Sequence, residues 1–165
     1  MVESAFSQIE LLVIDIDGTL TDAKIGWAGP AAGWTQLFSV RDGESIRRLC
    51  QRGIPVVPLS RNPTLCARAR MEGLGLPCDW LGVADKLAGF HELRQRYATR
   101  PERMAYVADG REDVPILQLV GFPIAVADAH QSVLAVAKYV TRARGGDHAL
   151  EEVIDLILEA RGWAS

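Results

Sequence analysis

The sequence has few of the features that mark secreted, membrane-bound or nucleic-acid-binding proteins. Its three cysteines, an odd number, form neither a CxxC pair nor a zinc-ligand cluster, which predicts free thiols in a reducing compartment. Residues 1–10 lack the apolar core of a signal peptide, and no apolar run approaches the roughly 20 residues of a membrane span. No basic block occurs, and the formal net charge is -3. We therefore expect a cytoplasmic protein that binds neither nucleic acid nor membrane.

Short apolar runs alternate with helical patterns along the 165 residues, which predicts an α/β fold with a mostly parallel, Rossmann-like sheet sandwiched by helices. The chain length suits a single domain covering residues 1–165. Strands are expected at 9–14, 54–59, 104–108, 122–126 and 138–140, with a weak one at 79–81. Helices are expected at 42–51, 63–72, 85–97, 114–119 and 148–161, where Pro63 and Asp85 would start two of them. The segment from about 23 to 40, with turn residues at 28–30, is expected to be a β-hairpin insertion.

Acidic and hydroxyl side chains follow three of the expected strands, at the point where each strand ends. Asp15 and Asp17 follow the first strand, Ser60 the second, and Asp109 and Asp113 the third. Because the carboxyl ends of parallel strands meet at one edge of a sheet, these side chains should converge there. Their convergence predicts a functional site at that edge.

Such a group of carboxylates has a characteristic chemistry. The carboxylates repel one another unless a cation lies between them, and oxygen ligands suit Mg²⁺. One carboxylate can then attack phosphorus and form an aspartyl phosphate. Lys86 and Ser60 are candidates to neutralise and bind the phosphate. Asp17, two residues after Asp15, can protonate the leaving oxygen and later accept a proton from water.

The segment Asp15-Ile16-Asp17-Gly18-Thr19-Leu20-Thr21-Asp22 resembles the first motif of the haloacid dehalogenase superfamily. Ser60, Lys86 and the acidic pair Asp109 and Asp113 follow in the order of that family's later motifs. The resemblance implies that Asp15 is the nucleophile and a Mg²⁺ ligand. It implies that Asp17 is the general acid and base and binds Mg²⁺ through its carbonyl oxygen, and that Asp109 is the third protein ligand. Ser60 and Lys86 would bind phosphate, and Asp113 would support the metal site from behind.

The sequence is most similar to one branch that lacks a cap domain, the 3-deoxy-D-manno-octulosonate 8-phosphate phosphatases and their sialic-acid-pathway relatives. The matching pieces are residues 38–43, Gly82 with Lys86, residues 106–107, 125–129 and 139–142, and Gly145-Gly146. The resemblance implies a small substrate, a 2-keto-3-deoxy sugar acid phosphate of eight or nine carbons, and a homotetramer assembled through the hairpins. Trp27 and Trp34 would suit such an interface, and they could equally pack on their own subunit. Arg41 and Asp42 could contact the substrate or could simply start a helix.

The chain departs from the family pattern at two places that matter for function. Gly110 follows Asp109 where a second polar residue is usual, and Asp147 follows Gly145-Gly146 where an arginine is usual. The second departure bears on the substrate more than on the chemistry. Two alternatives therefore stay open: a phosphatase for another metabolite or a phosphoprotein, and a binding or regulatory module without catalysis.

Overall fold

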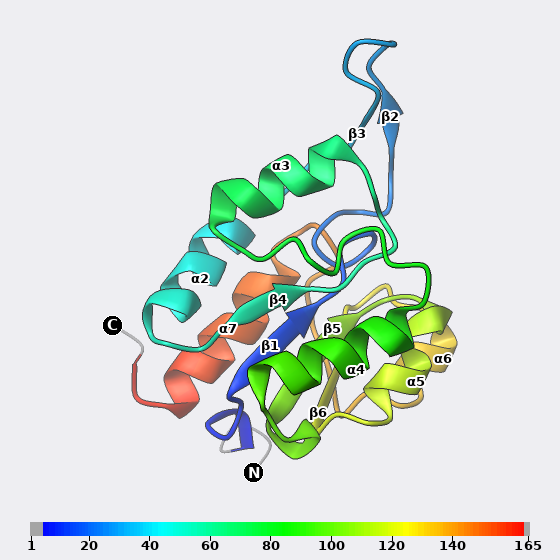
Figure 1. Cartoon of the computed structure of the whole chain (residues 1–165). Coiled ribbons are helices and arrows are strands. Elements are labelled where there is room, and N and C mark those ends of the chain that lie inside the picture. Colours follow the sequence, from blue (N-terminus) through cyan, green and yellow to red (C-terminus); the bar gives the residue numbers. More distant parts are fainter. Residues whose placement is uncertain (1–4, 164–165) are drawn as a thin grey trace.

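In the computed structural model, which describes residues 5–163, a five-stranded parallel sheet forms the centre of the molecule (Figure 1). Its strands are β1 (Leu11–Ile14), β4 (Val56–Pro58), β5 (Met104–Ala108), β6 (Phe122–Ala125) and β7 (Tyr139–Val140), in the order β4-β1-β5-β6-β7. The chain thus leaves β1 for β4 on one side and returns to β5 on the other. β1 and β5 flank the point where the strand order reverses, which is where open α/β sheets bind ligands.

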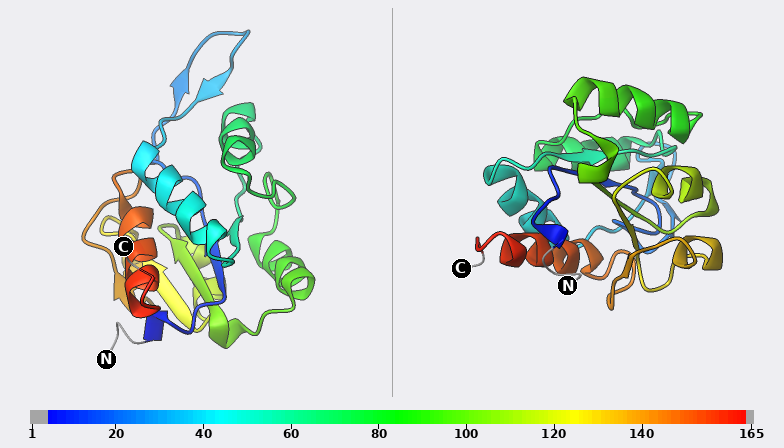
Figure 2. Two further views of the ribbon diagram at one scale, coloured as in Figure 1. Left: turned by 90° about the vertical axis from the view of Figure 1, so that its left-hand side faces the viewer. Right: turned by 90° about the horizontal axis from the view of Figure 1, so that it is seen from below.

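Helices cover both faces of the sheet (Figure 2). They are α2 (Val40–Gln51), α3 (Leu65–Leu74), α4 (Lys86–Tyr97), α5 (Val114–Leu117), α6 (Gln131–Leu134) and α7 (Ala149–Ala160). Short 3-10 helices, η1 (Pro101–Arg103) and η2 (Arg111–Asp113), flank β5. α2 and α7 pack together on one face, while α4 and α5 lie on the opposite face. The α/β fold with a parallel sheet is therefore confirmed.

The strands are central because they are apolar throughout. All four residues of β1 and all five of β5 are buried, as expected when helices cover both faces of a parallel sheet. α7 buries the apolar residues that recur at helical spacing: Leu150, Val153, Ile154, Ile157 and Leu158. Among residues 5–163, no helix is long and apolar enough to cross a bilayer.

The predicted hairpin is present and projects away from the sheet (Figures 1 and 2). It consists of β2 (Gly26–Trp27) and β3 (Trp34–Thr35), which pair antiparallel with Trp27 opposite Trp34. Gly29 has a φ of 90° and Gly33 a φ of 72°, a region that glycine enters without steric cost, so the loop between the strands can close. The described chain between β1 and α2 holds this hairpin and no cap domain.

Two sequence predictions differ from the structure. α3 begins after Thr64, whose side chain accepts a hydrogen bond from Ala67 N, so Pro63 precedes the helix instead of opening it. The weak strand at 79–81 is a single bridge between Ser60 and Leu81. By contrast, Asp85 caps α4 as predicted, accepting hydrogen bonds from the backbone N–H groups of Leu87 and Ala88. The three cysteines are free, half-buried thiols.

Candidate active site

The loop that follows β1 turns sharply and presents Asp15 at the edge of the sheet. Asp15 N donates to the carbonyl oxygen of Val107 in β5 at 3.0 Å, which keeps Asp15 in register with the sheet. The next residues wrap around one acceptor, the Ile16 carbonyl oxygen, which takes the N–H groups of Thr19, Leu20 and Thr21. Gly18 has a φ of 87°, and a Cβ added there would lie 2.1 Å from Asp109 Oδ2. Only glycine at position 18 therefore lets the loop after β1 approach Asp109 at the end of β5.

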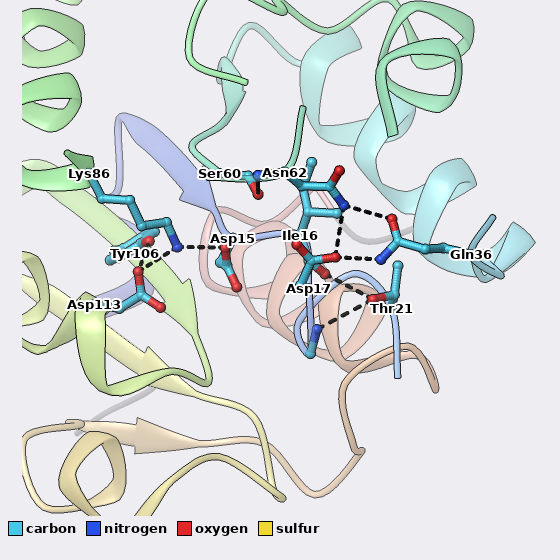
Figure 3. Close-up of polar contacts among 11 residues, drawn as sticks. Asp15, Ile16, Asp17, Thr21, Gln36, Ser60, Asn62, Lys86, Tyr106 and Asp113 are labelled. Atoms are coloured by element: carbon cyan, nitrogen blue, oxygen red, sulfur yellow. Dashed lines mark hydrogen bonds and ion pairs between the residues drawn. The ribbon is translucent and has the colours of Figure 1, made fainter. Parts of the chain in front are cut away.

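Three carboxylates and one ammonium group lie together beside this loop; Figure 3 shows Asp15, Asp113 and Lys86 of this cluster. Asp15, Asp109 and Asp113 each place an oxygen within 4.8 Å of the others. Lys86 Nζ lies 2.6 Å from Asp15 Oδ1 and 2.6 Å from Asp113 Oδ1. The Lys86 side chain is 5% exposed and that of Asp113 1%, so these ion pairs are shielded from water. Asp15 follows β1, Asp109 follows β5, Asp113 ends η2 and Lys86 begins α4. The structure thus brings Asp15, Asp109 and Asp113 together at the sheet edge, as the sequence predicted, and Lys86 joins them.

Burial and repulsion between carboxylates raise the pKa of Asp15 and of Asp109. Burial raises the pKa of Asp15 well above its usual value, and the nearby Asp113 and Asp109 add to this while Lys86 opposes it. Burial, together with Asp113, raises the pKa of Asp109 to about 6. For Lys86, burial disfavours the charge, but Asp15 and Asp113 outweigh it and raise the pKa. A divalent cation among these carboxylates would favour their ionised forms.

The donor set fits a hard divalent cation. The cluster offers oxygen atoms alone, which is the chemistry that Mg²⁺ prefers. Asp113 Oδ2 is buried and has no hydrogen-bond partner among the described residues, although its Oδ1 accepts from both Lys86 and the Tyr106 hydroxyl, each at 2.6 Å. An unpaired buried carboxylate oxygen is costly unless a cation or its water satisfies it. The residues present therefore match a magnesium site.

Ser60 follows β4, the neighbouring strand on the other side of β1. Its hydroxyl oxygen accepts a hydrogen bond from Asn62 N at 3.1 Å, and the residue is 1% exposed. The backbone is held from both sides, because Ser60 N donates to Trp80 O and Ser60 O accepts from Val83 N. The hydroxyl hydrogen is not used by this contact, so it can be donated to an anion.

Asp17 makes contacts that the sequence analysis did not predict. Its Oδ1 accepts hydrogen bonds from the side-chain amides of Gln36 and Asn62, the latter at 2.9 Å (Figure 3).

Gln36 follows β3 of the hairpin and carries no local sequence signal of this role. Asn62 had one, since it lies two residues after Ser60 at a strand end. Tyr106 was also missed, because a tyrosine inside an apolar strand is typical of the core.

The two predicted substrate residues differ in exposure: Asp42 is buried and Arg41 is exposed. Asp42 is fully buried, and its Oδ1 accepts from Glu151 N at 2.9 Å. Burial also raises the pKa of Asp42. A side chain with no exposed surface cannot contact a substrate directly, so the predicted substrate role of Asp42 is corrected: Asp42 anchors the first turn of α7. Arg41 is exposed and forms an ion pair with Glu151 at 2.8 Å. It lines a pocket of about 410 Å³ together with Ser39, Gly145 and His148, among others.

Residues 82–154 match the family model of the haloacid dehalogenase-like hydrolases. The chain is 39% identical to the 3-deoxy-D-manno-octulosonate 8-phosphate phosphatase KdsC of Yersinia pestis over 94% of its own length and 82% of that protein. The crystal structure of the phosphatase from Yersinia pestis superposes with a TM-score of 0.93 at 38% identity, covering 98% of this chain and 87% of that one.

A second solved structure bears on the ligands of the family. The 3-deoxy-D-manno-octulosonate 8-phosphate phosphatase of Moraxella catarrhalis, in complex with a magnesium ion, a phosphate ion and a KDO molecule, superposes with a TM-score of 0.89 at 28% identity. The match covers 98% of this chain and 92% of that one. Identity of this extent over nearly the whole chain shows that the protein belongs to the haloacid dehalogenase-like hydrolases, in the family of the 3-deoxy-D-manno-octulosonate 8-phosphate phosphatases.

Proposed function

We propose that this protein is a Mg²⁺-dependent phosphatase that hydrolyses the phosphate monoester of a 2-keto-3-deoxy sugar acid. The observation that carries the proposal is the position of Asp15, which lies at the carboxyl edge of the sheet among two other carboxylates and 2.6 Å from Lys86. A nucleophile, a cationic group and an oxygen-only metal site in one place are the requirements of phosphoryl transfer to a carboxylate.

Asp15, Asp109 and the Asp17 carbonyl would hold the magnesium ion, with the unpaired oxygen of Asp113 available to its water. When bound, the ion supplies positive charge that offsets the repulsion between the Asp15 carboxylate and the phosphate. Lys86 supplies a second, fixed positive charge, and Ser60 offers a hydroxyl donor.

Two displacements then complete the reaction. An Asp15 oxygen attacks phosphorus, the bond from phosphorus to the sugar oxygen breaks, and Asp17 gives its proton to that oxygen. In the second displacement Asp17 takes a proton from water, the water oxygen bonds to phosphorus, and the bond to Asp15 breaks. Inorganic phosphate leaves, and Asp15 and Asp17 return to their starting forms.

The substrate class is supported by the relatives and by one neighbouring feature. The relatives are phosphatases of 3-deoxy-D-manno-octulosonate 8-phosphate, and one of them was crystallised with KDO. Beside the catalytic loop lies the pocket of about 410 Å³ that Arg41 and His148 line. We infer that Arg41 can turn from Glu151 to the carboxylate of a sugar acid, because a guanidinium binds carboxylates in a bidentate manner.

We infer that the protein acts as a homotetramer assembled through the hairpins. Apolar side chains on and beside the hairpin are exposed to solvent: Ile25 by 60%, Trp27 by 58%, Trp34 by 49% and Leu37 by 85%. Exposed apolar side chains gathered on one projecting element are typical of a protein interface. The cytoplasmic location stays a prediction from the composition.

The proposal is tested by phosphate release in the presence of Mg²⁺ from octulosonate 8-phosphate, a nonulosonate 9-phosphate and 4-nitrophenyl phosphate. We expect turnover of one sugar acid phosphate, and its loss in Asp15→Asn but not in Asp155→Asn, which makes the same change on the exposed side of α7. Release from the aryl phosphate alone would retain a phosphatase but reject these two sugars. Full activity in Asp15→Asn would overturn the mechanism, and no release from any substrate would favour a binding module.

A further inference from the structure

The carboxylate of Asp17 is held by two neutral amides that act on one of its oxygens. Gln36 Nε2 donates to Asp17 Oδ1, and Asn62 Nδ2 donates to the same oxygen at 2.9 Å. The amides also contact each other, since Asn62 Nδ2 lies 2.8 Å from Gln36 Oε1. The three side chains form a closed triangle of contacts (Figure 3).

Asn62 is itself fixed by its own surroundings. Its Oδ1 accepts a hydrogen bond from Thr64 N at 2.9 Å, and its backbone N–H donates to Ser60 Oγ. The residue is 8% exposed. Because Oδ1 is occupied by a backbone donor, the Asn62 amide can only present its N–H₂ group to Asp17. Asn62 is thus a buried residue whose orientation is fixed before it contacts Asp17.

Gln36 approaches from a different element. It directly follows β3 and is half-buried, whereas Asn62 lies between β4 and α3. Asp17 therefore accepts one hydrogen bond from the segment that follows the hairpin and one from the loop between β4 and α3. Neither amide carries a charge, so their contribution is to fix the direction of the carboxylate.

Fixing Oδ1 in this way has a chemical consequence. Gln36 and Asn62 each donate one amide hydrogen to Asp17 Oδ1. Asp17 Oδ2 is therefore the oxygen left to exchange the proton with the leaving group. General acid catalysis requires that oxygen to lie within hydrogen-bond reach of the reacting atom, and a small misplacement can cost much of the rate. We propose that Gln36 and Asn62 are positioning residues that aim Asp17 Oδ2 at the leaving oxygen, an inference that rests on the proposed phosphatase function.

The role can be separated from general structural support by the choice of leaving group. A sugar alkoxide is a poor leaving group and needs protonation by Asp17, whereas 4-nitrophenolate leaves without it. Removing the hydrogen bonds that orient Asp17 should therefore reduce kcat/KM for the sugar phosphate far more than for 4-nitrophenyl phosphate. Because kcat/KM covers the steps up to departure of the leaving group, it excludes the later role of Asp17 with water.

The experiment compares Gln36→Met and Asn62→Ser with the wild-type enzyme on both substrates. Met has nearly the shape of Gln without the donor, and Ser can still accept from Thr64 N without reaching Asp17. We expect kcat/KM for the sugar phosphate to fall about 10- to 100-fold and that for the aryl phosphate to change less than about 3-fold. Gln95→Met, on the exposed face of α4, should change neither.

A double-mutant comparison sharpens the result. In the Asp17→Asn background, Gln36→Met should cause no further loss on the sugar phosphate, because the group that it positions has been removed. Equal losses on both substrates, no loss on either, or a full additional loss in the Asp17→Asn background would overturn the positioning role. Absence of Asp15-dependent turnover in the wild type would instead overturn the proposed function and, with it, this inference.

Discussion

At the scale of single residues, Lys86 is the group on which the buried site depends. It is the cation that contacts both Asp15 and Asp113, and it is almost fully enclosed. Removing one member of a buried ion pair leaves the others uncompensated. The stability of the folded protein therefore depends on the positive charge of Lys86 between these carboxylates.

Lys86→Met is expected to lower the free energy of unfolding at neutral pH by about 3–5 kcal/mol in the absence of divalent cations. Mg²⁺ should recover part of this loss, since it also compensates the carboxylates. Chemical denaturation with and without Mg²⁺ measures both effects, and Lys138→Met, which removes an exposed lysine that contacts Gly121 O, is the control. A variant as stable as the wild type without Mg²⁺ would contradict the structural role of Lys86.

The sequence predicted the charged groups of this cluster but not their neutral partners. Asp15, Asp109 and Lys86 carry the family motifs. The convergence of Asp15 and Asp109 follows from the parallel sheet, whereas Lys86, the first residue of α4, was selected only through the family resemblance. Tyr106 lies in a fully buried strand, where tyrosine normally serves packing, so its hydrogen bond to Asp113 could not be inferred. Asp42 stands in a matching motif, and only the packing of α2 against α7 shows that it is buried.

At the scale of elements, Glu152 joins α7 to the loop that leads from β7 towards the site. Its carboxylate accepts the Tyr139 hydroxyl at 2.6 Å and the backbone N–H groups of Arg142 and Ala143 at 2.9–3.0 Å. Partial burial opposes ionisation, but these donors outweigh it and lower the pKa of Glu152 from its ordinary value. The loop continues to Gly145, where a Cβ would lie 1.8 Å from Gly18 O, so Glu152 holds a segment that packs against the catalytic loop.

The pH dependence of stability follows from the sign of this shift. Because the folded-state pKa lies below the unfolded value, the stabilisation is present above about pH 4.5 and is lost as the pH falls through the folded-state pKa. Glu152→Gln should destabilise the protein by about 1 kcal/mol at pH 7, since solvent screens the half-exposed group. The difference should shrink towards pH 3 in urea titrations. A difference that is constant from pH 7 to pH 3 would contradict the ionic contribution.

At the scale of the whole molecule, the hairpin joins an exposed apolar surface to a side chain that contacts Asp17. Trp27 and Trp34 pack edge to face across its two strands with ring centroids 5.1 Å apart, and both are about half exposed. Gln36 follows one residue after the end of β3 and touches Asp17. Contacts that hold the hairpin in an oligomer would therefore also hold one of the donors to Asp17.

The double substitution Trp27→Ser with Trp34→Ser is expected to lower the oligomeric mass in light scattering while the sheet and helices keep their circular dichroism. Its kcat/KM should fall for a sugar phosphate more than for 4-nitrophenyl phosphate, because the hairpin no longer fixes Gln36. The exposed pair Leu119→Ser with Val140→Ser, outside the hairpin, serves as the control. An unchanged mass would rule out an interface built on these tryptophans.

The sequence by itself determined the sheet, the order of its strands and the acidic side chains that meet at its edge, because apolar strands with acidic ends specify both the core and the edge where the acids meet. Local signals also sufficed for the hairpin and for the cap that Asp85 forms. The tertiary structure alone decided which neutral groups serve those acids. Gln36, Asn62 and Asp17 are brought together by the return of the hairpin to the sheet edge, and such contacts depend on long-range packing that no local pattern encodes.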